Sequence, residues 1–212
     1  MSDAQFDVVV FGATSFVGQI LCQYLTDTYG VDGDLKWAAA GRSKDKLEQV
    51  KAQLGQAGSA LPLLTADAND DASLDSLCAQ TRVVVSTVGP YALYGEPMIR
   101  ACVTSGTDYC DLTGEVQWIA AMLEEYEDQA KQSGARIVHC CGFDSIPSDM
   151  GTYFLQQQAQ ARFKAPATRV KMRVKVAKGG VSGGTVASMM NIAEEAAGDP
   201  ALRKKLANPY LL

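Results

Sequence analysis

The chain has 212 residues, of which 47% are hydrophobic and 20% are charged, so it can bury a core and is not a disordered chain. Its formal net charge of -5 argues against a broad nucleic-acid-binding surface. No apolar run reaches the roughly 18 residues of a membrane span, and the N-terminus shows no secretory signal. We therefore expect no nucleic-acid partner, on the ground of charge, and no membrane span.

The cysteines indicate a reducing compartment. Most of them lie in apolar segments, and none has the CxxC spacing of a metal or redox site. They are Cys22, Cys78, Cys102, Cys110, Cys140 and Cys141. We interpret them as reduced thiols of a cytoplasmic protein.

Strand and helix patterns alternate along the first 150 residues. Apolar and β-branched runs predict strands over residues 6–11, 35–40, 61–66, 82–88, 109–112 and 136–141. Apolar residues at helical spacing predict helices over residues 16–29, 43–56, 70–79, 96–105 and 115–133. Such alternation implies right-handed crossovers between parallel strands. We therefore predict an α/β fold with a doubly wound parallel sheet, the Rossmann fold, over residues 1–150.

The pattern changes over residues 151–212. Residues 168–176 alternate basic and apolar side chains, which predicts a strand with one solvated face. A glycine-rich turn over residues 179–184 leads into a predicted helix that ends near Ala197. One strand and one or two helices cannot enclose a core. We therefore predict the incomplete beginning of a second α/β domain, which would bind substrate or form a dimer.

The turn after the first predicted strand has the pattern of a dinucleotide-binding site. Gly12 suits a tight reversal, and Gly18 lets the following helix approach the sheet. Ser15 replaces the usual middle glycine, and its hydroxyl, like that of Thr14, could contact a phosphate oxygen. The predicted cofactor-binding residues of this turn are Gly12, Thr14, Ser15, Phe16, Val17 and Gly18. The helix start would hold a pyrophosphate, and the alternative is a tight turn without a ligand.

The residues after the second predicted strand favour NADP(H) over NAD(H). NAD sites place an acidic residue there for the ribose hydroxyls, whereas this strand is followed by Arg42, Ser43 and Lys46. Arg42 can pair with a 2′-phosphate and stack on adenine, and Ser43 can donate from its backbone and hydroxyl. The alternative is a solvated, basic start of a helix. Asp67, just after the third strand, is a candidate acceptor for the adenine amino group.

The segment after the fourth predicted strand lies where the cofactor should cross the sheet. We predict that Val88, Gly89 and Pro90 contact the cofactor. Tyr91 and Tyr94 follow, and they could line the nicotinamide pocket, donate a proton or serve as packing aromatics. No tyrosine has a lysine four positions later, so the Tyr-x-x-x-Lys mechanism of short-chain dehydrogenases has no support.

The last predicted strand of this domain contains His139, the single histidine of the chain. We interpret it as a hydrogen-bonded core residue. A metal site with Cys140 and Cys141 is not predicted, because adjacent strand residues point to opposite faces. Asp144 and Ser145 follow the strand and are pocket candidates, although a helix cap would also explain them.

An ordered series of motifs resembles one known family. The motifs are GATSFVG (12–18), AGRS (40–43), STVGPYALYGEP (86–97), YCDLTGE (109–115), CGFDSIPSDMG (141–151) and GGVSGGTVASM (179–189). They resemble the saccharopine dehydrogenase-like oxidoreductases, on the branch that includes trans-acting enoyl reductases. The resemblance implies an NADP(H)-binding Rossmann domain followed by a mixed α/β domain with much of the substrate pocket. Family members are commonly much longer, so the chain resembles an N-terminal part.

The leading hypothesis is an NADPH-dependent reductase of a carbon–carbon or carbon–nitrogen double bond in a small, carbonyl-containing substrate. Its catalytic candidates, without a metal, are Tyr91, Tyr94, Asp144 and Ser145. The alternative is a non-catalytic NADP-binding regulatory or scaffold protein, because no acid–base residue is decisive. A third hypothesis is saccharopine reductase activity, in which the basic residues of 168–176 would bind substrate carboxylates. A homodimer formed through residues 151–212 is also considered.

Overall fold

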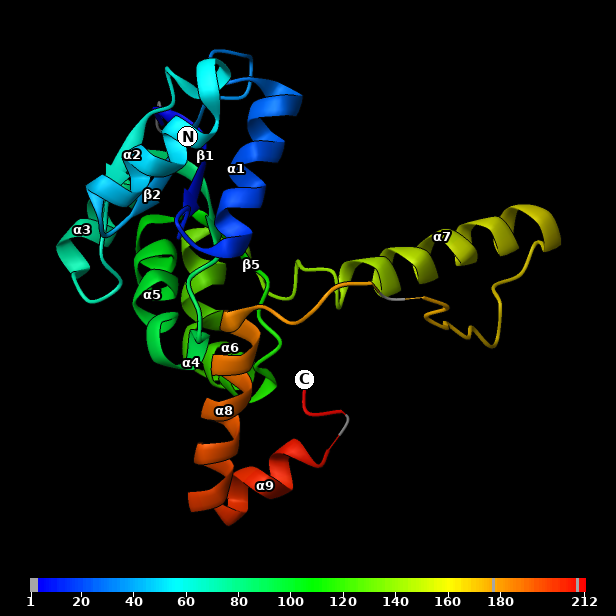
Figure 1. Cartoon of the computed structure of the whole chain (residues 1–212). Helices are drawn as coiled ribbons and strands as arrows, with labels where there is room; N and C mark the ends of the chain where they lie inside the picture. Colours follow the sequence, from blue (N-terminus) through cyan, green and yellow to red (C-terminus); the bar gives the residue numbers. More distant parts are fainter. Residues whose placement is uncertain (1–3, 177, 209) are drawn as a thin grey trace.

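The computed structural model describes residues 4–176, 178–208 and 210–212. It contains a parallel sheet with the strand order β3-β2-β1-β4-β5-β6 (Figure 1). The strands are β1 (Phe6–Phe11), β2 (Trp37–Gly41), β3 (Leu63–Thr65), β4 (Thr81–Ser86), β5 (Asp108–Asp111) and β6 (Ile137–Val138). This order is that of the doubly wound fold that binds dinucleotides, so the predicted fold class is confirmed.

Helices cover both faces of this sheet. They are α1 (Phe16–Tyr29), α2 (Lys44–Gln53), α3 (Asp71–Cys78), α4 (Tyr91–Tyr94), α5 (Glu96–Ser105) and α6 (Val116–Ser133), with a 3-10 helix, η1, at Gly55–Gly58. One buried core joins the sheet to α1 and α2 through Leu25 and Leu47. The other joins it to α3, α5 and α6 through Leu74, Ile99 and Trp118. Strand β1 contributes to both cores, which explains its continuous apolar sequence.

The sixth strand is shorter than predicted. Strand β6 covers only Ile137–Val138, not residues 136–141, and it pairs with β5 at the edge of the sheet. Just beyond it, the Asp111 carboxylate accepts a hydrogen bond from the Cys140 N–H at 3.1 Å. Cys140 has a φ of 61°, in the left-handed region, so the chain leaves the extended conformation there.

The helices after residue 145 lie outside the sheet. These are α7 (Ile146–Phe163), α8 (Gly183–Gly198) and α9 (Pro200–Leu206), and α8 confirms the helix predicted to end near Ala197. Figure 1 shows α7 pointing away from the sheet, whereas α8 and α9 lie beside α6 at its lower end. None of the described helices has the length and apolar character needed to cross a bilayer.

The strand predicted over residues 168–176 is wrong. These residues form no regular element, and almost all of them are exposed. A strand needs a neighbour for its backbone hydrogen bonds, and no described residue of this region offers one. The alternating pattern is therefore present in the sequence without the sheet that it would require.

Candidate functional site

Two glycines shape the turn between β1 and α1. Gly12 has a φ of 89°, and a Cβ atom there would lie 2.7 Å from Val88 Cγ2. A Cβ atom at Gly18 would lie 2.3 Å from the carbonyl oxygen of Gly12, so a side chain would force the backbone apart. Ser15 caps α1 by accepting a hydrogen bond from the Gly18 N–H at 2.9 Å. The turn thus holds the start of α1 against the ends of β1 and β4.

The first turn of α1 presents free backbone donors. Within the described part of the chain, no hydrogen bond occupies the N–H of Phe16 or Val17. Phe16 is 68% exposed, so its side chain does not close this end of the helix. Unpaired N–H groups, together with the helix dipole, make such a start a site for an anionic group.

The Ser15 hydroxyl is engaged inside the turn. Thr87 Oγ1 lies 2.9 Å from the carbonyl oxygen of Gly12 and 3.3 Å from that of Phe11. It also lies 3.0 Å from Ser15 Oγ. Because the single hydroxyl proton of Thr87 goes to a carbonyl, Ser15 donates its own proton to Thr87. Ser15 therefore holds the turn against the end of β4. The free N–H groups of Phe16 and Val17 are better placed than the Ser15 hydroxyl to bind an anion.

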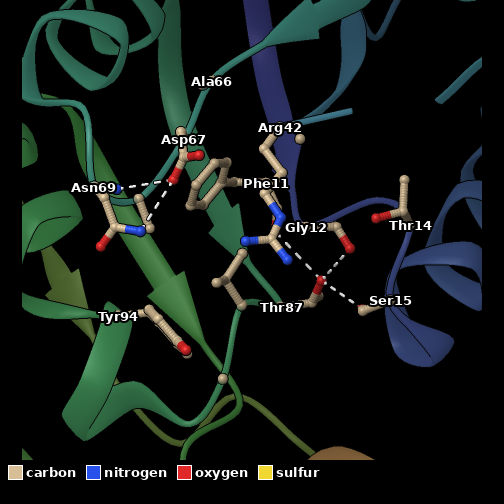
Figure 2. Close-up of a pocket in the computed structure, with 14 residues that line it drawn as sticks. Phe11, Gly12, Thr14, Ser15, Arg42, Ala66, Asp67, Asn69, Thr87 and Tyr94 are labelled. Carbon is tan, nitrogen blue, oxygen red and sulfur yellow. Dashed lines mark hydrogen bonds between the residues drawn. The ribbon is translucent and has the colours of Figure 1, made fainter. Parts of the chain in front are cut away.

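A first cavity, of about 250 Å³, lies over the ends of the strands on one side of this turn (Figure 2). In Figure 2, the Arg42 side chain crosses the middle of this space, with Asp67 and Asn69 on one side and Tyr94 below. None of the ion pairs among the described residues involves Arg42. The predicted residues that line the cavity are Gly12, Thr14, Ser15, Arg42, Asp67, Val88, Gly89 and Tyr94.

Six predicted cofactor residues lie outside this lining: Phe16, Val17, Gly18, Ser43, Lys46 and Pro90. Ser43 caps α2 by accepting a hydrogen bond from the Lys46 N–H at 3.4 Å. The Lys46 side chain is exposed, and Pro90 is buried in front of α4. The structure thus gives Ser43 a capping role and Pro90 a packing role, and their contacts with a cofactor stay predictions.

A second cavity, of about 610 Å³, lies on the other side of the same turn. Ser15, Thr87 and Gly89 line both cavities, so the two spaces meet at the turn. Phe16 and Val17 line only the second one, which is also bounded by the first half of α8. In this fold, ligands bind where the strand order reverses, which is between β1 and β4 here. Both cavities open at that position.

The two candidate tyrosines face different cavities. Tyr94 lines the first cavity and is 38% exposed, whereas Tyr91 lines the second and is only 6% exposed. The Tyr91 hydroxyl donates to the carbonyl oxygen of Ser86 at 3.0 Å. Burial, together with the nearby Asp111 carboxylate, raises the pKa of Tyr91 well above its ordinary value. This geometry favours a packing role for Tyr91 over proton donation.

His139 is a hydrogen-bonded core residue, as the sequence predicted. Its Nδ1 atom lies 2.7 Å from Oδ2 of the buried Asp111, and its ring packs edge-on against Trp118 with ring centroids 5.1 Å apart. Of the two candidates that follow, Asp144 lines the second cavity. Ser145 stands at the N-cap position of α7 without a side-chain capping bond.

Sequence reasoning missed three residues of this region. Thr87 ties the turn together, and its position at the end of a buried strand was a signal that could have identified it. Asn69 donates its backbone N–H to Asp67 Oδ1 at 3.0 Å and lines the first cavity. Glu115 is 1% exposed and lines the second cavity. Its contacts come from segments distant in sequence, so no local pattern predicts them.

Comparisons with known proteins agree with this geometry. Residues 8–138 match the family described as the saccharopine dehydrogenase NADP binding domain. The protein Rv2449c of Mycobacterium tuberculosis, provisionally named a trans-acting enoyl reductase, is 44% identical over 208 residues, which are 98% of this chain and 49% of that protein. The trans-acting enoyl reductase of Mycobacterium bovis is 36% identical over 212 residues, which are 100% of this chain and 50% of that protein. The chain spans about half the length of these curated relatives.

A solved structure shares the fold. Apo histidine-tagged saccharopine dehydrogenase (L-Glu forming) from Saccharomyces cerevisiae superposes with a TM-score of 0.56 at 18% sequence identity. The likeness covers 75% of this chain and 32% of that one. At this identity the likeness supports the Rossmann architecture alone.

Proposed function

The chain belongs to the family of the saccharopine dehydrogenase NADP binding domain, and from this premise we propose that it forms the cofactor-binding half of an NADPH-dependent reductase. The site fits a dinucleotide in two respects. The free N–H groups of Phe16 and Val17 suit a pyrophosphate. The absence of a side chain at Gly12 and Gly18 lets the helix start stand close to the strand ends.

One observation carries the proposal: the two cavities meet at Ser15, Thr87 and Gly89. A dinucleotide consists of two nucleoside halves joined by a pyrophosphate, so it needs two adjoining spaces with an anion site between them. The adenosine half would occupy the first cavity and the nicotinamide half the second. The pyrophosphate would then lie at the start of α1.

The first cavity also supports the choice of NADP(H). Arg42 crosses this space (Figure 2), where its guanidinium can pair with a 2′-phosphate. Asp67 lies beside it as an acceptor for the adenine amino group, and the Tyr94 ring offers a wall for stacking. An acidic residue in place of Arg42 would have favoured NAD(H).

The second cavity supports a substrate whose reacting group is uncharged. Bound NADPH supplies a hydride from its nicotinamide ring. Much of the cavity wall is apolar, with Phe16, Leu112 and Met189, whereas Thr113 and Thr185 offer hydroxyl groups. Such a wall excludes water and suits an α,β-unsaturated carbonyl compound held by a few polar contacts. The names of the curated relatives likewise support reduction of a carbon–carbon double bond.

Saccharopine reductase activity has less support. That reaction would need cationic side chains for several carboxylates. No described lysine or arginine lines the second cavity, and Arg169 and Lys171 line a separate groove beside α7. We therefore keep Asp144, which lines the second cavity, with Ser145 beside it, as catalytic candidates of an enoyl-type reductase.

A binding protein without turnover is the second candidate. It is favoured by the buried and engaged Tyr91 hydroxyl and by the position of Tyr94 in the other cavity. Neither tyrosine offers a free proton donor to the nicotinamide half. Residues 151–212 would then serve, as in the reductase proposal, as the start of a second domain that closes the site with α8.

The cofactor assignment is tested with Arg42→Ala. We expect the variant to lose about 10- to 100-fold in NADPH affinity, because a charge-assisted hydrogen bond is worth about 1.5–3 kcal/mol. NADH affinity should change little. Nucleotide fluorescence titration measures both constants, and Lys131→Ala is the matched control because this exposed lysine of α6 lines neither cavity. Equal affinity of the wild type for NADPH and NADH would contradict the assignment.

The reductase proposal is tested by turnover. The whole 212-residue chain is mixed with NADPH and trans-2-octenoyl-coenzyme A, and NADPH oxidation is followed by absorbance. We expect slow oxidation that depends on the enoyl thioester, because the chain supplies only the cofactor-binding half of the proposed reductase, and a cyclic imine with two carboxylates serves as the comparison substrate. Oxidation that the cyclic imine supports better than the enoyl thioester would contradict the choice of an enoyl-type substrate.

A further inference from the structure

Glu115 is a buried carboxylate that the cofactor site and α8 share. It is 1% exposed and stands just before α6 at the wall of the second cavity. None of the ion pairs among the described residues involves it. A buried carboxylate is costly unless hydrogen bonds replace its hydration, so its donors matter.

Two of these donors belong to the segment that crosses the site. Glu115 Oε1 accepts the backbone N–H of Tyr91 at 2.8 Å, and Oε2 accepts that of Ala92 at 2.9 Å. This segment begins at Gly89, which lines both cavities, and ends at Tyr94, which lines the first. The carboxylate therefore holds the backbone on which both halves of the cofactor would rest.

The third donor comes from α8. The Ser188 hydroxyl donates to Glu115 Oε1 at 2.7 Å, across 73 positions of sequence. The first half of α8 forms one wall of the second cavity, through Ser182, Thr185, Ser188 and Met189. Residues 168–182, which precede α8, form no regular element where they are described, so α8 is placed by its contacts rather than by its linker.

We propose that Glu115 is a positioning residue that couples NADPH binding to the docking of α8 over the second cavity. Oε1 of Glu115 accepts hydrogen bonds from both the Tyr91 N–H and the Ser188 hydroxyl. If either α8 or the Gly89–Tyr94 segment moves, the carboxylate moves with it, and its hydrogen bond to the other weakens. Coupling of this kind is reciprocal: a ligand that fixes the Gly89–Tyr94 segment also favours docked α8. The inference rests on the proposed function only in taking NADPH as the ligand.

The experiment uses the full chain and Ser188→Ala, a half-buried position on α8 where loss of a hydroxyl leaves the sheet domain intact. We expect NADPH affinity to fall at least about fivefold. We also expect hydrogen exchange of the α8 amides to slow on NADPH addition in the wild type, and this slowing to disappear in Ser188→Ala. Ser188→Thr keeps the hydroxyl and should restore both properties. Protection of residues 12–18 by NADPH should persist in all three proteins.

A second contact of α8 supplies the control. Gln117 Nε2 donates to Glu195 Oε2 at 3.3 Å, which also links α6 to α8 but involves no hydrogen bond to the Gly89–Tyr94 segment. Gln117→Ala should leave NADPH affinity within about twofold of the wild type. An equal loss in Gln117→Ala and Ser188→Ala would overturn the inference, because general docking of α8 would then explain both.

The outcomes separate this inference from the proposed function. NADPH that protects residues 12–18 but leaves α8 exchange unchanged in the wild type would overturn the inference and leave cofactor binding standing. NADPH that protects neither region would instead contradict the proposed function.

Discussion

The sheet domain and the region after residue 145 differ in what stabilises them. Residues of β1 and β2 are buried against helices on both faces, in two separate cores. In contrast, α7 has a single buried residue, Ala159, and α8 and α9 have none. Met150, Tyr153 and Phe154 on α7 are at least half exposed. Helices can form from local hydrogen bonds, whereas strands need partners, so only helices appear where no core is present.

A pair of glycine substitutions should give the largest difference in stability between the two regions. Gly18→Val places a side chain where a Cβ atom would already lie 2.3 Å from a backbone carbonyl oxygen, so we expect loss of more than about 4 kcal/mol of stability. Gly151 lies in α7, and a Cβ atom there meets nothing within 4 Å. Gly151→Ala should therefore leave stability unchanged or raise it by up to about 1 kcal/mol. Urea denaturation monitored by circular dichroism measures both variants.

Truncation of one leucine in each region gives the next largest difference. Leu47 is 0% exposed and packs in the core beneath α2, so Leu47→Ala should cost about 3 kcal/mol. Leu155 on α7 is 49% exposed, and Leu155→Ala should cost less than about 0.5 kcal/mol. The free energies of unfolding from denaturant titration report the contrast. A similar cost at both positions would show that α7 is packed in solution against a surface absent from this structure.

The smallest effect is a pH dependence confined to the sheet domain. Burial raises the pKa of Cys22 to about 12 from its ordinary 9.0. Below pH 9 the Cys22 thiol is neutral in both the folded and the unfolded protein. Above pH 9 the thiol ionises in the unfolded protein first. The free energy of unfolding should therefore fall by about 1.4 kcal/mol at pH 10 from this group.

The control for this pH effect is Cys22→Ala. The substitution lowers stability at every pH by loss of packing. Above pH 9, however, the free energy of unfolding of the variant should fall less steeply with pH than that of the wild type. Parallel slopes for the two proteins, measured by denaturation at pH 8, 9 and 10, would show that the Cys22 thiol ionises equally in both states.

The cofactor turn was predictable because its determinants are local. Gly12, Ser15 and Gly18 act through backbone conformation and capping within one strand–turn–helix unit, and the structure places all three in that unit. Arg42 follows the next strand and, as parallel strands end at one edge, its position in the first cavity also follows from order along the chain. The resemblance to saccharopine dehydrogenase-like proteins rested on the same local motifs.

Other features depended on contacts that a sequence does not display. The separation of Tyr91 and Tyr94 into two cavities arises from the short helix α4, whose start is held by Glu115. The strand predicted over residues 168–176 does not form. The alternating pattern indicates which residues would face a core, but it does not show whether that core exists.

The order of residues along the chain by itself determined the alternating elements and the glycine turn after β1, and it predicted NADP(H) as the cofactor. These properties depend on periodicity, glycine positions and charge close to the strand ends, so they are written over short stretches. Only the tertiary structure decided which hydroxyls are engaged, which cavity each tyrosine faces and how α8 meets Glu115. Those choices depend on free energies of burial and hydrogen bonding between segments far apart in sequence, and such energies exist only once the segments are packed together.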